Sequence, residues 1–217
     1  MLHKVGSIRG TDVHATDGYI GRVEEFYFDD AQWTIRYLAV NTNSWLQRRH
    51  PVLISPAAVA SDWGRAGFNL TLTREQVRNS PEIDLTRVPS REEEIGVLGH
   101  FGHPLYWKAN GQNGSTPNLC ATKDLIGDHI QARDGEIGHI DDVLIDEASW
   151  RVDYLVVDTS NWIGGKWVAI VPQVLRSIDW EAGTVEVSIT RDAVKQSPPM
   201  DSMPVPSAET MPPFMLM

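Results

Sequence analysis

Four pairs of neighbouring acidic residues are the first feature of this chain that could do chemistry. They are Glu24-Glu25, Asp29-Asp30, Asp141-Asp142 and Asp146-Glu147. Two carboxylates that face one site can bind a cation or work as an acid and a base. Neighbours on a strand, however, point to opposite faces of the sheet. We therefore interpret the pairs as solvated residues of strand edges and turns, where charge discourages aggregation, and predict no catalytic or metal site from them.

Histidine and cysteine offer a second candidate chemistry. Of the seven histidines, only His100 and His103 have the spacing of metal ligands, with Cys120 as a distant third ligand. Zinc sites usually show tighter ligand pairs and four ligands, so we interpret both histidines as linker residues. Cys120 is the only cysteine, which excludes an intrachain disulfide. Because the chain also lacks a P-loop, G-x-S-x-G or G-x-G-x-x-G motif, we predict no enzyme activity and no cofactor.

Tryptophan is the most suggestive residue type. Six of the eight tryptophans form pairs 117 residues apart: Trp33/Trp150, Trp45/Trp162 and Trp63/Trp180. We expect Trp33 and Trp150 to fill the ends and turns of their domains. Trp45 and Trp162 instead end two polar loops, which follow Asn41 and Asp158. An aromatic residue in such a loop often anchors a partner, so Trp45, Trp162, Asn41 and Asp158 are the candidate partner-binding residues.

These pairs belong to an internal duplication. The stretch DGYIGRVEEFYFDDAQWTIRYLAVNTNSW at 17–45 returns as DGEIGHIDDVLIDEASWRVDYLVVDTSNW at 134–162, always 117 positions later. The register runs without a gap from Ile8/Leu125 to Pro81/Pro198, whereas Leu85–Cys120 shows no repetition. The sequence therefore predicts two domains, 1–84 and 120–201, a linker with a short helix at 85–119 and a disordered tail at 202–217.

Each repeat is dominated by strand patterns. An Asp-Gly pair predicts a tight hairpin turn. In the next strand, one extra residue at Glu24-Glu25, and again at Asp141-Asp142, is needed to keep the apolar residues on one face, which predicts a β-bulge at each place. Bulges bend strands enough to close a small barrel. The following strands, 33–40 and 150–157, are apolar on both faces. One face would line the interior, and the other needs a cover, either a helix or the other repeat.

Charge and hydropathy restrict the partners. The net charge of −10 disfavours nucleic acid and anionic membrane surfaces, both of which require clustered Lys and Arg. No run of 18 apolar residues is present, so we predict no membrane span. The N-terminal segment lacks an apolar signal core. These features favour a cytoplasmic location.

The motif set resembles that of a known family. D-G-x-I-G, an acidic pair, D-[DE]-A-x-W, Y-L-x-V-[ND]-T and T-R-[DE]-x-[VA]-x-x-S-P occur in both repeats, and together they resemble the PRC-barrel family. That family is named for a domain of the photosynthetic reaction centre H subunit, and a related domain ends a ribosome maturation factor. The resemblance implies a mainly β chain with two tandem small bent barrels and short helices, similar to stand-alone bacterial PRC-barrel proteins.

Two functions are compatible with these features. The first is a non-catalytic protein-interaction or adaptor module, in which the two repeats pack as a pseudo-dimer around a twofold axis. Its protein partner is not identified by the sequence, and self-association into a homo-oligomer is one form of it. The alternative is a small-molecule- or metal-binding protein, or an enzyme, with its site in the cleft between the two barrels.

Overall fold

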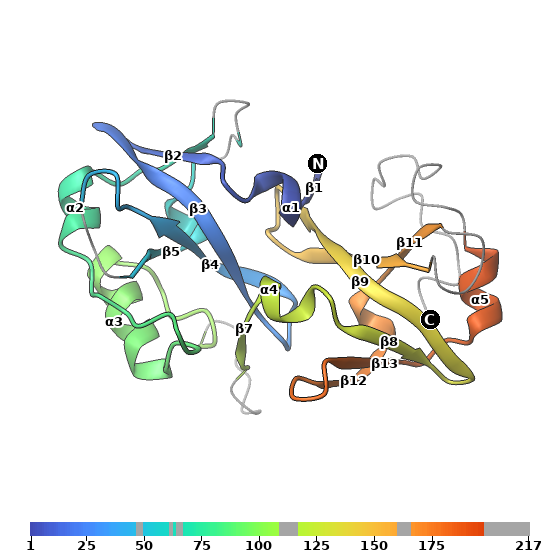
Figure 1. Cartoon of the computed structure of the whole chain (residues 1–217). Coiled ribbons are helices and arrows are strands. Elements are labelled where there is room, and N and C mark those ends of the chain that lie inside the picture. The colour runs from blue at the N-terminus through green and yellow to red at the C-terminus, as the bar shows by residue number, and fades with distance from the viewer. Residues whose placement is uncertain (47–49, 61–62, 64–66, 109–116, 160–165, 198–217) are drawn as a thin grey trace. The chain divides into compact units, whose positions relative to one another are not determined.

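A computed structural model describes residues 1–46, 50–60, 63, 67–108, 117–159 and 166–197 of the chain (Figure 1). The chain is mainly β and divides into two compact units. The first-repeat unit comprises Ser7–Thr122 and Ala148–Arg151. The second-repeat unit comprises Met1–Gly6, Lys123–Glu147 and Val152–Met217. The predicted tail at 202–217 lies outside the described residues.

The first-repeat unit holds a six-stranded sheet in the order β5-β4-β3-β2-β6, with β7 paired to β3. All neighbours are antiparallel except β2 and β6. The elements are β2 (Asp12–Ala15), β3 (Gly18–Asp29), β4 (Thr34–Asn41), β5 (Val52–Ile54), η1 (Pro56–Ala58), β6 (Phe68–Asn69), α2 (Arg74–Arg78), α3 (Arg91–Phe101) and β7 (Leu119–Ala121). Helix α1 (Val5–Ile8) leads into this unit.

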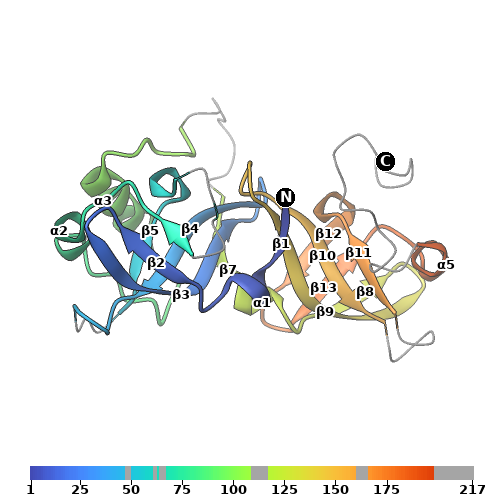
Figure 2. The same cartoon turned by 90° about the horizontal axis from the view of Figure 1, so that it is seen from above.

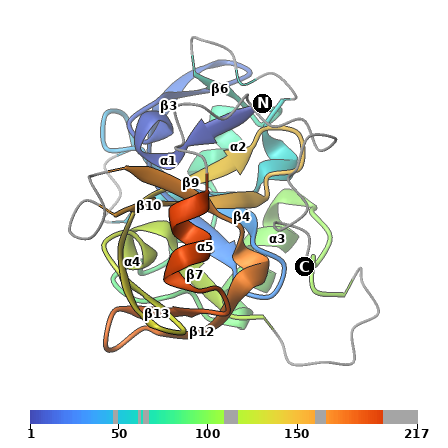
Figure 3. The ribbon, with the colours of Figure 1, turned by 90° about the vertical axis from the view of Figure 1, so that its right-hand side faces the viewer.

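The second-repeat unit holds a seven-stranded sheet in the order β11-β10-β9-β8-β13-β12, with β1 paired to β9 (Figure 2). Helix α5 contacts β9 in the same unit (Figure 3). The elements are β1 (Leu2–Lys4), α4 (Thr122–Leu125), β8 (His129–Ala132), β9 (Gly135–Asp146), β10 (Val152–Asp158), β11 (Trp167–Ile170), η2 (Pro172–Val174), β12 (Leu175–Asp179), β13 (Thr184–Val187) and α5 (Arg191–Gln196).

The two repeats exchange equivalent strands. Strand β1 precedes the first repeat but pairs with β9 of the second, whereas β7 precedes the second repeat and pairs with β3 of the first. The two strands lie 117 positions apart, so the duplication extends to Leu119, into the stretch that the sequence analysis treated as unrepeated. The domain ranges 1–84 and 120–201 stay a prediction.

The predicted β-bulges are confirmed in both repeats. Along β3, Val23 pairs with Val40 but Glu25 pairs with Ala39, which leaves Glu24 as the extra residue. Along β9, the shift falls at the equivalent place, around Asp141. Each bulge offsets the step of three in the apolar pattern, so the apolar side chains on either side of it stay buried.

The glycines of D-G-x-I-G allow the strands to approach closely. A Cβ on Gly21 would lie 1.9 Å from the carbonyl oxygen of Asn41, and a Cβ on Gly138 would lie 1.9 Å from that of Asp158. Both glycines also have positive φ angles, 147° and 152°. Only glycine meets both requirements without strain, which explains the presence of this residue in both copies.

The aspartates of the two Asp-Gly turns also bind the N-terminal ends of helices α2 and α5. Asp17 accepts a hydrogen bond from the backbone N–H of Arg74, the first residue of α2, at 2.7 Å. Asp134 does the same for Arg191 of α5 at 2.8 Å. Such contacts satisfy an N–H group that has no partner within the helix. Helices α2 and α3 each begin with a capping box, formed by Thr73 with Gln76 and by Ser90 with Glu93.

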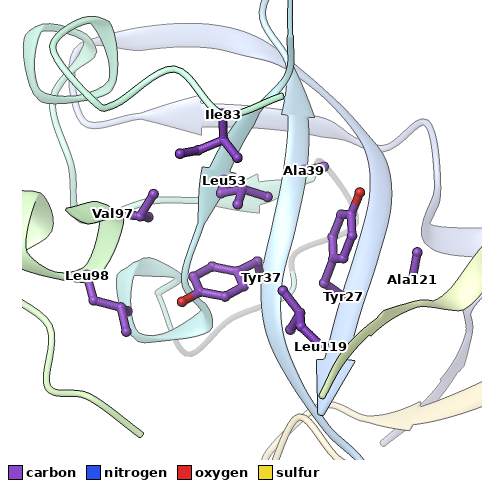
Figure 4. Close-up of a cluster of buried hydrophobic side chains, with 9 residues drawn as sticks. All are labelled: Tyr27, Tyr37, Ala39, Leu53, Ile83, Val97, Leu98, Leu119 and Ala121. Carbon is purple, nitrogen blue, oxygen red and sulfur yellow. The ribbon is translucent and has the colours of Figure 1, made fainter. Parts of the chain in front are cut away.

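Helix α3 covers the second apolar face of strand β4. Val97 and Leu98 of α3, together with Ile83, pack against Tyr37 and Leu53 in one buried cluster (Figure 4). The sequence left open whether a helix or the other repeat provides this cover. In the first-repeat unit it is the helix of the predicted linker.

The gapless register is wrong over one short stretch. Val52 and Val168 occupy equivalent places next to β4 and β10, as do Ile54 and Ile170, so the offset there is 116. The two 3-10 helices that follow keep this offset. It returns to 117 at the parallel pairings of Val13 with Phe68 and of Ile130 with Val185. The second repeat therefore has one residue fewer than the first before β11, and one residue more between η2 and β13.

Candidate interaction site

Glu25 fixes the exchanged segment in the first-repeat unit. Its side chain is only 7% exposed and accepts hydrogen bonds from the Thr122 hydroxyl at 2.6 Å and from Arg9 Nη2 at 2.7 Å. The bulge also directs the N–H of Phe26 to the same carboxylate, at 2.8 Å. Because Thr122 directly follows β7, this carboxylate ties the exchanged strand to β3.

Asp142 has the equivalent place and role in the second-repeat unit. Both carboxylate oxygens lie 3.2 Å from the backbone nitrogen of Gly6, two residues after β1. The N–H of Val143 donates to the same group at 2.8 Å. One acid from each predicted bulge pair thus holds the strand that comes from the other repeat.

The interpretation of the acidic pairs as solvated residues is therefore wrong for three of the eight acids. Glu25 and Asp142 are buried, and Asp29 is fully buried, where it accepts from Arg36 Nε and from the backbone N–H of Gln32, each at 2.6 Å. Such carboxylates are stable only when paired. The partner arginine was visible in the sequence, since a hairpin brings Arg36 back beside Asp29.

A further buried acid comes from helix α3. Glu94 is 1% exposed, accepts from the Tyr106 hydroxyl at 2.8 Å and forms an ion pair with Arg91 at 2.9 Å. Burial raises the pKa of Glu94, while the hydrogen bond from Tyr106 and the charge of Arg91 oppose that rise. Burial also raises the pKa of Tyr106 far above its ordinary value. This group fixes α3 on the sheet and is structural.

The loop residue Trp45 has contacts within its own unit. Its indole N–H donates to the carbonyl of Ile20 at 2.6 Å, and the guanidinium of Arg74 lies 4.4 Å from the ring centroid. Asn41 donates to Glu24 at 3.0 Å. These contacts fix the Trp45 and Asn41 side chains within their own unit.

Its counterparts in the second repeat are described less fully. Asp158 ends strand β10 and pairs with His139 and Trp167, whereas Trp162 lies outside the described residues. Partner binding by Trp45, Trp162, Asn41 and Asp158 stays a prediction.

His100 and His103 have different surroundings. Nε2 of His100 lies 2.9 Å from the carbonyl oxygen of Gln76. Burial lowers the pKa of His103, and its Nε2 atom has no hydrogen-bond partner among the described residues. Cys120 is buried in β7. Within the described part of the chain, no three His, Cys, Asp or Glu side chains group as metal ligands.

The exposed aromatic residues differ between the repeats. Trp63 packs against Trp150 with ring centroids 4.3 Å apart, but its counterpart Trp180 is 40% exposed. Trp167, at the start of β11, is 46% exposed. The offset of 117 pairs Trp63 with Trp180 but does not distinguish their roles. The flanking acids Asp179 and Glu181, where copy one has Asp62 and Gly64, were the available signal.

Trp180 is presented by a fixed turn. It directly follows β12, the last strand in its sheet order. Asp179 accepts hydrogen bonds from the backbone N–H groups of Glu181 at 3.1 Å and Ala182 at 2.9 Å. The indole therefore lies at the end of an edge strand, between two exposed acids.

A cavity of about 370 Å³ lies in the first-repeat unit. Arg36, Tyr106 and Trp150 line it together with His103. Since the Arg36 guanidinium already donates to Asp29 and to Gln32, the imidazole is the polar group still lacking a partner among the described residues.

A family model for the PRC-barrel domain matches residues 2–65 and 120–194, well over half of the chain. The chain belongs to the PRC-barrel family. The two PRC-barrel domains begin, in sequence, at the exchanged strands β1 and β7, so each domain as the family defines it contributes its first strand to the other unit. No curated protein matches this PRC-barrel chain. Among its described residues, no helix is long and apolar enough to cross a membrane.

Proposed function

We propose that this tandem PRC-barrel protein is a non-catalytic, cytoplasmic interaction module that binds a basic protein partner through the Trp180 turn. The observation that carries the proposal is the divergence of Trp180 from Trp63. In one repeat the tryptophan packs inside its unit, and in the other it is 40% exposed on a rigid turn. Exposed tryptophans held in this way are typical centres of binding energy.

The charge around the turn supports a basic partner. Asp179 and Glu181 flank Trp180, and the whole chain has a net charge of −10. Acidic groups around an aromatic anchor favour the approach of a surface rich in Lys and Arg. The edge of β12 beside the anchor can also accept an added strand. The non-catalytic part of the proposal is supported by the acids shared by the repeats, because Glu25 and Asp142 serve to hold strands.

Affinity capture from extracts of the source cell tests this function. The bait is the full chain, compared with a Trp180→Ala variant and with a Tyr19→Ala control, whose ring is 36% exposed in the other unit. We expect retention of the partner to fall at least tenfold for Trp180→Ala, to stay unchanged for the control and to weaken in high salt. Equal retention by all three baits would refute the proposal.

A second candidate function, small-molecule binding, is favoured by the cavity beside His103. Its volume of about 370 Å³ is within the range of ligand pockets, and its lining combines aromatic rings with one imidazole. A thermal-shift screen with small polar aromatic compounds tests it. A stabilising compound should lose its effect in a His103→Phe variant. Stabilisation that survives this substitution would exclude the cavity as the site.

A further inference from the structure

The duplication continues beyond the last pair identified from the motifs. With the same offset of 117, the segment after Pro81 matches the segment after Pro198. The identical pairs are Asp84/Asp201, Val88/Val205, Pro89/Pro206, Ser90/Ser207 and Glu92/Glu209. Three of these pairs are consecutive and include the residue that caps α3. The C-terminal residues 199–217 are therefore the second copy of the segment that, in the first repeat, contains α3.

The first copy of this segment has a defined task. Ile83, Val97 and Leu98 are 4%, 1% and 2% exposed and pack on Tyr37 and Leu53 of the sheet (Figure 4). Their counterparts are Met200, Phe214 and Met215, which are all large and apolar. Apolar side chains are thus retained at the three positions that cover the sheet.

The sheet face that would receive the second copy is also present. Tyr154 and Val156 of β10 are the counterparts of Tyr37 and Ala39, and Ala169 of β11 takes the place of Leu53. Trp167 lies two positions before Ala169, so its side chain is on the same face of β11. Its indole is 46% exposed, and the ammonium of Lys4 lies 6.0 Å from the ring centroid. Tyr154, Val156 and Ala169 are 2%, 0% and 3% exposed, so this apolar face is covered in the folded chain except at the ring of Trp167.

We propose that residues 199–217 of the same chain dock on this outer face of β10 and β11. Met200, Phe214 and Met215 take the places that Ile83, Val97 and Leu98 have in the first-repeat unit. Because Pro212 and Pro213 stand where α3 has Ile95 and Gly96, the second copy does not repeat the helical sequence pattern of the first.

A segment of the same chain is favoured over another molecule. Helix α5 ends at Gln196, so the segment begins three residues after the last helix of the second-repeat unit. Its roughly 20 residues reach about 60 Å when extended. Tethering gives such a segment an effective concentration in the millimolar range, which a free partner rarely reaches. Position 211 also carries Met where the first copy has the buried Glu94, so docking here buries no second carboxylate.

Hydrogen exchange on the full chain tests the proposal. In a Phe214→Ser, Met215→Ser double variant, the amide protection factors of Val152–Asp158 and Trp167–Ile170 should fall at least tenfold. Those of β4 and β5 should stay unchanged. The matched control is Met203→Ser, Met217→Ser, because the counterparts of these residues, Thr86 and His100, are exposed. We expect the control to behave as the parent chain.

Further measurements distinguish residues 199–217 from a second copy of the chain as the occupant of this face. A chain that ends at Ser197 should show the same loss, and a synthetic 199–217 peptide should restore the protection while a Phe214→Ser peptide should not. Unchanged protection in the double variant, or an equal loss in the control, would overturn the proposal. Protection that rises with protein concentration would assign the face to a second copy and would overturn it as well. Partner capture by Trp180 is a separate readout, so either proposal can fail alone.

Discussion

Removing the hydroxyl of Thr122 should loosen the exchanged strand β7. The side chain is fully buried, donates to Glu25 at 2.6 Å and accepts from Arg9 at 2.8 Å. Thr122→Val keeps the shape and deletes the hydroxyl. Valine suits this position, because the equivalent residue of the other repeat is Val5, which is also fully buried.

The magnitude follows from the contacts that remain. A hydrogen bond to a charged group contributes about 1.5–3 kcal/mol. Since Glu25 keeps its bonds to Arg9 and to the N–H of Phe26, we expect a loss of about 2 kcal/mol, or roughly 30-fold faster exchange of the Leu119–Ala121 amides. Thr122→Ser keeps the hydroxyl and loses one methyl group, about 0.8 kcal/mol, or roughly fourfold.

A double-mutant cycle with Glu25→Gln isolates the contact. We expect a coupling free energy of at least about 1 kcal/mol between Thr122 and Glu25. The reasoning is refuted if the coupling is near zero, or if the valine variant exchanges no faster than the serine variant. Either result would mean that the hydrogen bond does not hold β7.

Three further predictions concern single sites. Gly138→Ala should lower the stability of its unit by about 3 kcal/mol or more, measured by urea denaturation, because the new Cβ would lie 1.9 Å from a carbonyl oxygen; Gly99→Ala, with open space around it, is the control. Tyr106→Phe removes the hydrogen bond to buried Glu94 and should cost about 1–3 kcal/mol by the same assay; an unchanged midpoint would contradict the structural role of this pair. The Arg87 ion pair lowers the pKa of Glu93 from 4.5 to about 2, so the stability it gives α3 should be complete above pH 4.5 and lost as the pH falls towards 2, followed by carboxylate NMR titration; an ordinary titration midpoint would contradict it.

Local patterns predicted the local features of this fold. The bulges follow from a break in the period of two, and the helix starts follow from Thr73 and Ser90 with their partners three residues later. The strand exchange leaves no such signal. Leu2–Lys4 and Leu119–Ala121 are equivalent strands of three residues, and the residue pattern of neither strand predicts which sheet it joins.

The candidate site was harder to predict, because its environment comes from distant residues. Glu25 looked like a solvated acid since its partner Thr122 lies 97 positions away. Trp45 looked like a free anchor because Ile20 and Arg74 meet it only in the folded unit. Trp180 differs from Trp63 through neighbours that matter only once the turn is formed.

The exchanged strands also set the order in which the chain can complete its folding during synthesis. Strand β1 leaves the ribosome well before strand β9, with which it pairs at His3 and Ile145. At about 5–20 residues per second, the partner follows roughly 7–28 seconds later. During that interval the three-residue strand has no sheet to join. Extensions fused before Leu2 therefore act first on the second domain, although the first domain is made before it.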